Sequence, residues 1–277
     1  MSEYEQVKMS LFRRRDLSMA VVNADDATGV KIIEEVAGRI PVIGISMASN
    51  PPCEIPMVVI NDIVKKRGGF NVELLTPWGR GWVDVPLLGA CNLYNVMSLV
   101  ATLGCLKWSW SDIVNAVEGL CPVTGRMHTL GGGNLPVVVV DYAHTPDALD
   151  KLLEDVKQHA NNKLTCVFGC GGNRDTGKRP LMAKIAEKHA SEIIITTDNP
   201  RFEDPQAIVD DIVRGLDQPA KAEVILDRAE AITNAIDSAS PGDVVVIAGK
   251  GHESFQIIEG NQLPFSDIKV VEQFLNK

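Results

Sequence analysis

Polar and charged side chains cluster directly after four predicted strands in the second half of the sequence. Each segment combines glycines or turn-forming residues with ionisable side chains, and the segments are residues 141–146, 169–175, 197–201 and 248–253. In an open α/β sheet, ligands bind outside the carboxyl ends of the strands. One such loop would carry little weight, because βα loops are commonly polar. Four of them at one edge of a sheet predict a ligand-binding site there.

The glycine-rich segment 172–178 has the spacing of a phosphate-binding loop as far as Lys178. The next residue is Arg179, whereas that motif needs a Ser or Thr hydroxyl for Mg²⁺, so we reject a Walker A loop here. Pro180 suits the first turn of a helix, and a glycine-rich turn before a helix N-terminus still favours an anion. The glycines within 169–172 do not fit the GxGxxG pattern, so the sequence gives only weak support for an NAD site.

Metal and covalent chemistry find little support in the sequence. The five histidines form no HxxxH or HExxH pattern, and His159 and His189 end predicted helices, where a cation suits the helix dipole. No GxSxG nucleophile elbow occurs. The six cysteines form no CxxC pair and are interpreted as reduced thiols, with Cys166 and Cys170 packing beside a strand end. The four tryptophans are expected to pack in the core or in a hairpin.

The composition indicates a folded protein with an excess of acidic residues. With 277 residues, of which 45% are hydrophobic and 23% charged, the chain can form one large domain or two modest ones. The net charge of -9 argues against a nucleic-acid partner, although we expect a local cationic pocket. No apolar run approaches the roughly 18–20 residues of a membrane span, and the polar, acidic start is unlike a signal peptide. We therefore expect no membrane insertion and a cytoplasmic location.

Residues 1–122 mix strands with helices. The predicted elements are strands at 17–22 and 41–45, an antiparallel hairpin at 70–85, and helices at 28–36, 93–103 and 111–120. The polar segment 23–26 can cap the first of these helices, and Ser111 is the expected N-cap of the last.

Residues after Gly125 alternate regularly between strands and helices. The predicted strands are 137–140, 164–168, 192–196, 223–225 and 244–247, and the predicted helices are 146–159, 180–189, 205–215, 229–239 and 267–275. Strands that alternate with helices of 10–15 residues indicate βαβ units and a mostly parallel, doubly wound sheet. The fold class is therefore α/β, with a domain boundary near 122–124.

These motifs, taken in order, resemble the Mur ligases, and among them most closely those that add meso-diaminopimelate. The resemblance rests on residues 169–175, 177–180, 198–201 and 249–253, and residues 4–8, 23–26, 88–92 with Asn95, 125–127 and 141–146 agree with it. It runs from about Tyr4 to the C-terminus. It implies a truncated central, ATP-binding domain over 1–123 and a doubly wound, Rossmann-like C-terminal ligase domain over 124–277 that binds the incoming amino acid.

The resemblance also implies a reaction, namely ATP-dependent amide formation in peptidoglycan synthesis with ATP and Mg²⁺. The γ-phosphate would activate a carboxylate of UDP-N-acetylmuramoyl dipeptide as an acyl phosphate, which the amine of meso-diaminopimelate attacks. Lys8 would be carbamylated and help to hold Mg²⁺, and His144, the second implied catalytic residue, would lie beside the nucleotide. The nucleotide would be bound by Asn95, Arg126 and Asp141. The implied diaminopimelate residues are Arg174, Asp198, Asn199, Pro200, Arg201, Gly249 and Glu253. Without the surrounding resemblance, Lys8 would be interpreted as a solvated lysine on a helix face.

One departure from the family pattern bears on activity. In the family a UDP-sugar domain and a Walker A loop precede the lysine that corresponds to Lys8, and this sequence begins just before it. We expect a fragment of a longer ligase, inactive alone, rather than a split enzyme whose partner supplies the phosphate loop. The alternatives are a non-catalytic module that binds an amino acid or a nucleotide, and a related ligase such as folylpolyglutamate synthase, against which the Asp-Asn-Pro-Arg run at 198–201 argues.

Overall fold

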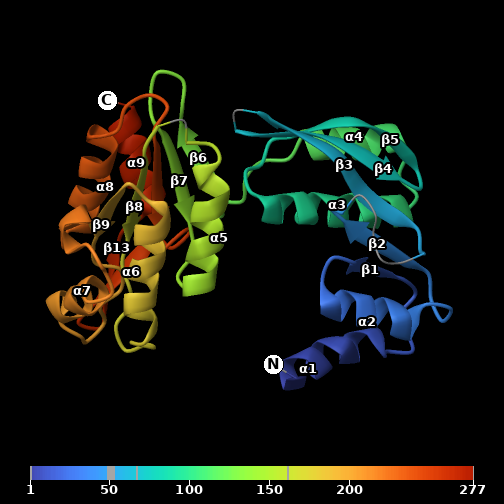
Figure 1. Cartoon of the computed structure of the whole chain (residues 1–277), viewed down its shortest axis with the longest axis horizontal. Coiled ribbons are helices and arrows are strands. Elements are labelled where there is room, and N and C mark those ends of the chain that lie inside the picture. Colours follow the sequence, from blue (N-terminus) through green and yellow to red (C-terminus); the bar gives the residue numbers. More distant parts are fainter. Residues whose placement is uncertain (1, 49–53, 67, 161, 277) are drawn as a thin grey trace. The chain divides into compact units, whose positions relative to one another are not determined.

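The structure is a computed structural model that describes residues 2–48, 54–66, 68–160 and 162–276. The chain forms two compact units, Met1–Cys121 and Pro122–Lys277 (Figure 1). None of the described helices is long and apolar enough to cross a membrane.

The first unit is built on a mixed five-stranded sheet whose spatial order follows the chain, β1-β2-β3-β4-β5. The first two pairs of neighbours are parallel and the last two are antiparallel. The strands are β1 (Ala20–Asn23), β2 (Val42–Ser46), β3 (Met57–Lys66), β4 (Gly69–Thr76) and β5 (Gly79–Val85). The last two strands form the predicted hairpin, and the strands predicted at 17–22 and 41–45 are confirmed with shifted ends.

Four helices cover this sheet and create two separate cores. They are α1 (Ser2–Phe12), α2 (Ala27–Val36), α3 (Ala90–Cys105) and α4 (Trp110–Glu118). Val42 packs in one core with Ile33 of α2, whereas the next residue, Ile43, packs in the other core with Met97 of α3. Because successive strand residues point to opposite faces, the two cores lie on opposite sides of the sheet. The predicted cap of α2 is Asp26, whose Oδ1 accepts hydrogen bonds from two backbone N–H groups, at 2.8 and 3.1 Å.

Three details of the first unit differ from the predictions. Strand β3 was not predicted. Helix α4 is capped by Ser109 rather than Ser111, because the backbone of Ser109 is extended (φ -68°, ψ 154°) and its side chain accepts the N–H of Asp112. Two tryptophans that were expected to pack, Trp82 and Trp108, are 46% and 47% exposed.

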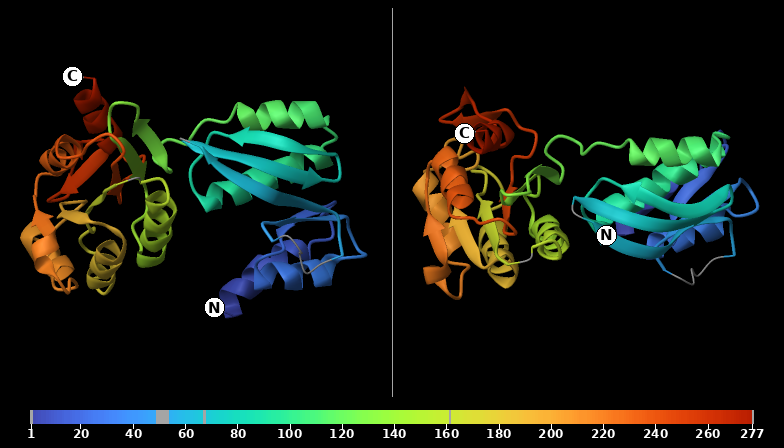
Figure 2. Two further views of the ribbon diagram at one scale, coloured as in Figure 1. Left: turned by 45° about the horizontal axis from the view of Figure 1, so that its top comes forward. Right: turned by 90° about the horizontal axis from the view of Figure 1, so that it is seen from above.

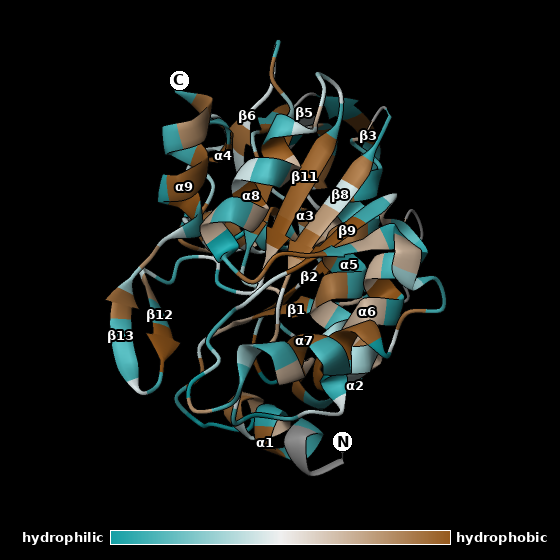
Figure 3. Cartoon of the chain, turned by 90° about the vertical axis from the view of Figure 1, so that its left-hand side faces the viewer, coloured by the Kyte–Doolittle hydropathy of each residue, from teal (hydrophilic) through white to brown (hydrophobic). Residues whose placement is uncertain are grey.

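The second unit contains a six-stranded sheet in the order β10-β9-β8-β11-β7-β6. All neighbours are parallel except β6 and β7, so the predicted doubly wound sheet is confirmed. Its strands are β6 (His128–Gly131), β7 (Val137–Asp141), β8 (Leu164–Phe168), β9 (Glu192–Ile195), β10 (Ala222–Val224) and β11 (Val244–Ala248). The two central strands, β8 and β11, are buried at every residue and mostly apolar, as expected of strands that helices cover on both faces (Figure 3).

The helices of the second unit lie on both sides of this sheet, with α5, α6 and α7 on one face and α8 and α9 on the other (Figures 2 and 3). They are α5 (Pro146–Lys157), α6 (Lys178–His189), α7 (Pro205–Val213), α8 (Arg228–Asp237) and α9 (Asp267–Leu275), with a short 3₁₀ helix at Pro219–Lys221. All five predicted helices are confirmed. Strand β6 and a separate antiparallel hairpin, β12 (Phe255–Ile258) with β13 (Asn261–Pro264), were not predicted.

Candidate ligand-binding site

A pocket of about 370 Å³ lies at the carboxyl ends of the parallel strands of the second unit. The loops after β7, β8, β9 and β11 all contribute to it, because these four strands are neighbours that run in the same direction. The pocket brings together seven of the predicted site residues, which are His144, Arg174, Asp198, Asn199, Arg201, Gly249 and Glu253. The predicted placement of the four polar loops is thus confirmed, while the roles of their residues remain proposals.

The charges that line the pocket are balanced rather than cationic. Three side chains carry positive charge and three carry negative charge, and they are Arg174, Lys178 and Arg201 against Asp175, Asp198 and Glu253. The expectation of a local cationic pocket was therefore wrong, because each loop that carries a basic group also places a carboxylate at the pocket. Such a lining suits a ligand that has both anionic and cationic groups.

Arg201 is fixed by its own backbone and by half of its guanidinium group. Its backbone is left-handed (φ 56°), its N–H donates to the carbonyl of Ile257 at 3.0 Å, and its carbonyl accepts the N–H of Glu259 at 2.6 Å. Its Nη1 donates to the carbonyl oxygens of Gly172 at 2.9 Å and Asn199 at 3.3 Å. Within the described part of the chain, Nε and Nη2 of Arg201 have no hydrogen-bond partner, so these donors are left for a ligand.

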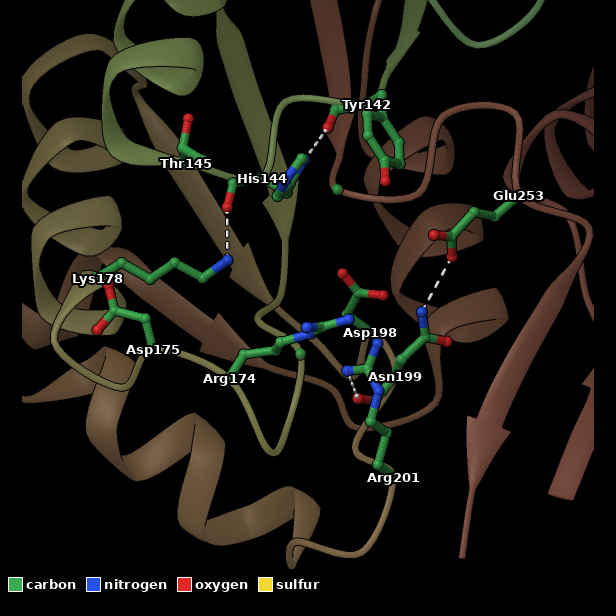
Figure 4. A pocket seen from close by; sticks show the side chains of 12 residues that line it. Tyr142, His144, Thr145, Arg174, Asp175, Lys178, Asp198, Asn199, Arg201 and Glu253 are labelled. Carbon is green, nitrogen blue, oxygen red and sulfur yellow. Dashed lines mark hydrogen bonds between the residues drawn. The ribbon is translucent and has the colours of Figure 1, made fainter. Parts of the chain in front are cut away.

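The loop that carries Arg174 is braced against the loop that carries Arg201. Glu203 accepts the N–H of Asn173 and forms an ion pair with Arg179 at 2.7 Å. These two bonds, led by the one from Asn173, lower the pKa of Glu203. Gly172 is needed where the two loops approach each other, since a Cβ at this position would lie 2.0 Å from the carbonyl oxygen of Pro200. Arg174 itself makes no hydrogen bond or ion pair to any described residue, and its side chain reaches across the pocket toward Asp198 (Figure 4).

A buried lysine, Lys250, joins three of the predicted site residues. Its Nζ donates to Asn199 Oδ1 at 3.0 Å and to Glu253 Oε2 at 2.9 Å, and it lies 3.6 Å from Asp198 Oδ1. The amide of Asn199 also donates to Glu253 Oε2, at 3.0 Å (Figure 4). No role was predicted for Lys250, although it stands inside one of the motifs; its position between two glycines is the signal that could have drawn attention to it.

The two carboxyl groups of this cluster respond differently to their surroundings. Burial raises the pKa of Asp198, although the positive charges of Arg228 and Lys250 oppose the rise. Burial acts in the same direction on Glu253, but the hydrogen bonds from Lys250 and Asn199 outweigh it and the net pKa is lowered. Glu253 is therefore held as a carboxylate.

Beneath the pocket lies an ion pair with no solvent exposure, between Arg228 and Asp267. The two residues open helices α8 and α9, and their side chains are joined by hydrogen bonds of 2.7 and 2.8 Å. Arg228 Nη2 also donates to the carbonyl of Ala248 at 3.0 Å, and its Nη1 lies 3.5 Å from the carbonyl oxygen of Thr197. The pair therefore ties both helix starts to the ends of β9 and β11, and sequence reasoning missed it.

The other side of the pocket is formed around Tyr142. The guanidinium of Arg126 lies 4.7 Å from the centre of the Tyr142 ring, and His144 Nδ1 lies 2.9 Å from the carbonyl oxygen of Tyr142. Lys178 Nζ donates to the carbonyl of His144 at 2.7 Å. The buried carboxylate of Asp141 accepts the backbone N–H groups of Met127 and Ala143, both at 2.7 Å, so it holds the two loops that carry Arg126 and His144.

The remaining predicted residues, Asn95 and Lys8, belong to the first unit. Exposed Asn95 donates to the side chain of Asn92 at 3.1 Å. Lys8 lines a pocket of about 420 Å³ together with Asn23 and Asp26. An ammonium group is not a metal ligand, and no cluster of three or more His, Cys, Asp or Glu side chains among the described residues could hold a metal ion. A metal role for Lys8 therefore depends on its carbamylation.

Two family models match the chain, the Mur ligase middle domain over residues 1–103 and the Mur ligase, glutamate ligase domain over residues 125–251. Two similar curated proteins, from Coxiella burnetii and Pseudomonas putida, are UDP-N-acetylmuramoyl-L-alanyl-D-glutamate–2,6-diaminopimelate ligases, 41% and 43% identical to this chain. Each match covers 99% of this chain. The chain spans 56% of the length of each of these relatives.

Solved structures agree with this relationship. A ligase structure of the same name is 36% identical with a TM-score of 0.72, and the match covers 99% of this chain and 56% of that one. A folylpolyglutamate synthase of Thermotoga maritima, 18% identical, has a TM-score of 0.68 over 90% of this chain and 55% of that one, and shows a shared fold alone. The chain therefore belongs to the Mur ligase family, of which it contains the middle domain and the glutamate ligase domain.

Proposed function

We propose that the second unit binds the incoming amino acid of an ATP-dependent amide ligase of peptidoglycan synthesis, and that this amino acid is meso-diaminopimelate. The observation that carries the proposal is the balanced set of charges around the pocket. Diaminopimelate has a carboxylate and an ammonium group at each end, so it needs guanidinium and carboxylate partners together. The names of the two curated relatives support the same substrate.

Each pocket residue then has a role that its contacts permit. Arg201, with its unused Nε and Nη2, and Arg174 bind the distal carboxylate. Glu253, which is held as a carboxylate, accepts the distal ammonium group beside Asp198. Asn199 orients Glu253, Pro200 and Gly249 shape the loops, and a Cβ at Gly249 would lie 3.1 Å from Asp198 Oδ2.

In this proposal the Tyr142 side of the pocket lies nearest to the attacking amine and the activated carboxylate. In the second unit, Arg126 and Asp141 are assigned to the nucleotide. In the first unit, Asn95 is assigned to the nucleotide, and Lys8 helps to hold Mg²⁺ once carbamylated. ATP, when bound, supplies the phosphoryl group that activates the acceptor carboxylate. Because a carbonyl oxygen only accepts, the hydrogen bond to Tyr142 requires a proton on His144 Nδ1. In the neutral ring this leaves the lone pair of Nε2 to take a proton from the attacking amine.

Calorimetric titrations of the chain with meso-diaminopimelate, lysine and glutamate, with and without ATP, test the proposal. Lysine lacks the distal carboxylate, so it leaves the guanidinium site without an anion. A charge-assisted bidentate contact contributes roughly 1.5–3 kcal/mol, or about 10- to 150-fold in affinity. We expect diaminopimelate to bind more tightly than lysine by that factor, and Arg201→Ala to remove the preference while lysine binding changes much less.

The matched control is Arg80→Ala, which removes an exposed arginine from β5 of the first unit and should leave both affinities unchanged. A melting curve checks that Arg201→Ala is folded. Tighter binding of glutamate would favour a folylpolyglutamate synthase-like ligase, and binding of diaminopimelate that never responds to ATP would favour a non-catalytic module. A folded Arg201→Ala chain with an unchanged diaminopimelate-to-lysine ratio would exclude Arg201 from the specificity site.

A further inference from the structure

Lys250 is a lysine whose side chain has no solvent exposure. Burying an ammonium group costs several kcal/mol unless its hydrogens and its charge are satisfied, so the partners of Lys250 show what it does. It stands between Gly249 and Gly251, whose backbones are left-handed (φ 117° and 53°). A Cβ at Gly251 would lie 2.6 Å from the carbonyl oxygen of Gly125. The two glycines therefore let this loop lie close against its neighbours, with the lysine side chain behind the pocket.

We propose that Lys250 is a positioning residue that fixes the Glu253 carboxylate in the orientation in which it accepts the ammonium group of the incoming amino acid. The inference rests on the proposed function and extends it to a residue that does not line the pocket. Lys250 and Asn199 both donate to Oε2 of Glu253, at 2.9 and 3.0 Å. Oε1 of Glu253 has no hydrogen-bond partner among the described residues. One oxygen is thus anchored twice, and the other is left for the ligand.

The ammonium group of Lys250 also counters the negative charges that lie around it. Asp198 and Glu253 both approach Lys250, and Asp267 contributes a further negative charge from α9. The opposing positive charge is Arg228 from α8, and a further titratable group, the imidazole of His252, stands on the loop of Lys250 itself. Arg174 and Arg201 face the cluster from the other side of the pocket. Lys250 is the cation of this set that contacts Glu253 directly.

Removal of Lys250 therefore changes both the orientation of Glu253 and its protonation. Without the ammonium group, Glu253 loses one of its two anchoring bonds and the charge that opposes its desolvation, so its pKa rises. A protonated Glu253 cannot pair with an ammonium group. Ligand affinity is lost as the pH falls through the pKa of Glu253, and in Lys250→Met this loss begins at a higher pH than in the wild type.

The experiment uses the full chain and two readouts. Side-chain carboxyl carbons of carbon-13-labelled glutamate are titrated by NMR without ligand, with Glu253→Gln to assign the signal. Calorimetric titration with meso-diaminopimelate from pH 5 to 8 gives the affinity profile; because the pKa of Glu253 is lowered from 4.5, the acid limb of the wild type lies below this range and that of Lys250→Met should move toward or into it. Lys250→Met should raise the pKa of Glu253, weaken binding at pH 7 by about 10- to 100-fold and shift the acid limb of the profile upward. Lys250→Arg, which keeps the charge, should restore part of the affinity. The matched control is Lys221→Met, at an exposed lysine of the 3₁₀ helix, which should match the wild type.

A folded Lys250→Met chain with wild-type titration of Glu253 and a wild-type affinity profile would overturn the proposal. If that variant does not fold, the wild type still decides, because Glu253 must titrate below its ordinary value of 4.5; a Glu253 that titrates at or above it would also overturn the proposal. A wild-type chain that binds no diaminopimelate would instead remove the proposed function, and the NMR titration would still show whether Lys250 sets the state of Glu253.

Discussion

Removing the positive member of the buried pair Arg228–Asp267 should destabilise the second unit strongly. Both side chains have no solvent exposure, so Arg228→Met leaves the Asp267 carboxylate buried without its cation. It also removes the donor to the carbonyl of Ala248. Loss of one partner of a buried ion pair costs about 3–5 kcal/mol, since the remaining charge is uncompensated.

The expected shift of the melting temperature follows from the size of the unit. For folded units of 150–250 residues, 1 kcal/mol corresponds to roughly 2–4 °C. The second unit, residues 122–277, falls in that range, so Arg228→Met should lower its melting temperature by about 6–20 °C. The control is Arg14→Met, which removes one member of the exposed pair Arg14–Asp16 and should leave the melting temperature unchanged, because water already screens that pair.

The positions of the tryptophans make it possible to assign the loss of stability to one unit. All four tryptophans lie in the first unit, so tryptophan fluorescence follows its unfolding, whereas far-UV circular dichroism follows both units. Arg228→Met should lower the midpoint temperature of the transition that circular dichroism detects for the second unit, and should leave the midpoint temperature of the fluorescence transition unchanged. A melting temperature that stays within 2 °C of the wild type would refute the reasoning, as would a shift confined to fluorescence. Arg228→Met/Asp267→Leu, which removes both charges, should recover most of the loss.

Two further predictions concern the backbone and the thiols. Gly251→Ala should lower the free energy of unfolding by several kcal/mol and weaken ligand binding, because the added Cβ would lie 2.6 Å from a backbone carbonyl oxygen. The control is Gly38→Ala, at a residue that is also left-handed but has open space around it. Chemical denaturation should show a loss of only about 1–2 kcal/mol for this control. Burial raises the pKa of the Cys166 and Cys170 thiols to about 12. Alkylation mapped by mass spectrometry should therefore label exposed Cys121 long before either of them. Rapid labelling of Cys170 in the folded chain would contradict its burial.

The second unit could be predicted from its sequence because its elements have strong local signals. The run Val137–Val140 is continuous and β-branched, as expected of a strand that is covered on both faces, and it lies within β7. Helix α9 has the predicted bounds, Asp267–Leu275, and Ser266 caps it by accepting the N–H of Lys269. The placement of the polar loops followed from the direction of the strands alone.

The missed strands have weaker or interrupted patterns. In β3 the register shifts between Ile60 and Asp62, which breaks the alternation of apolar and polar residues on which a strand prediction depends. Strand β6 is a partly buried edge strand of four residues, and β13 is exposed throughout and ends at Pro264. Short strands at an edge are defined by their partners more than by their own residues.

The missed part of the site consists of contacts between residues far apart in the chain. Arg228 and Asp267 are separated by 39 residues, and each opens a helix, where a charged residue is ordinarily solvated. The inward position of Lys250 depends on two left-handed glycines, which no hydrophobic period records. Sequence reasoning therefore located the loops and their ligand-facing residues, but not the charges that hold them in place from behind.

The distribution of buried charge supports a functional reason for these charges. Among the described residues, every charged side chain that is buried lies in the second unit: Asp141, Arg179, Asp198, Arg228, Asp243, Lys250 and Asp267. Five of them, Asp141, Arg179, Asp198, Arg228 and Lys250, contact the loops or strand ends that form the pocket, and Asp267 is paired with Arg228. Apolar residues of similar volume often give equal or greater stability than a buried ion pair, so stability alone does not require them. Their concentration behind one pocket is expected if they fix the direction of the ligand-facing groups. The double variant Arg228→Met/Asp267→Leu should therefore recover most of the melting temperature that Arg228→Met loses, while its affinity for the amino acid stays below that of the wild type.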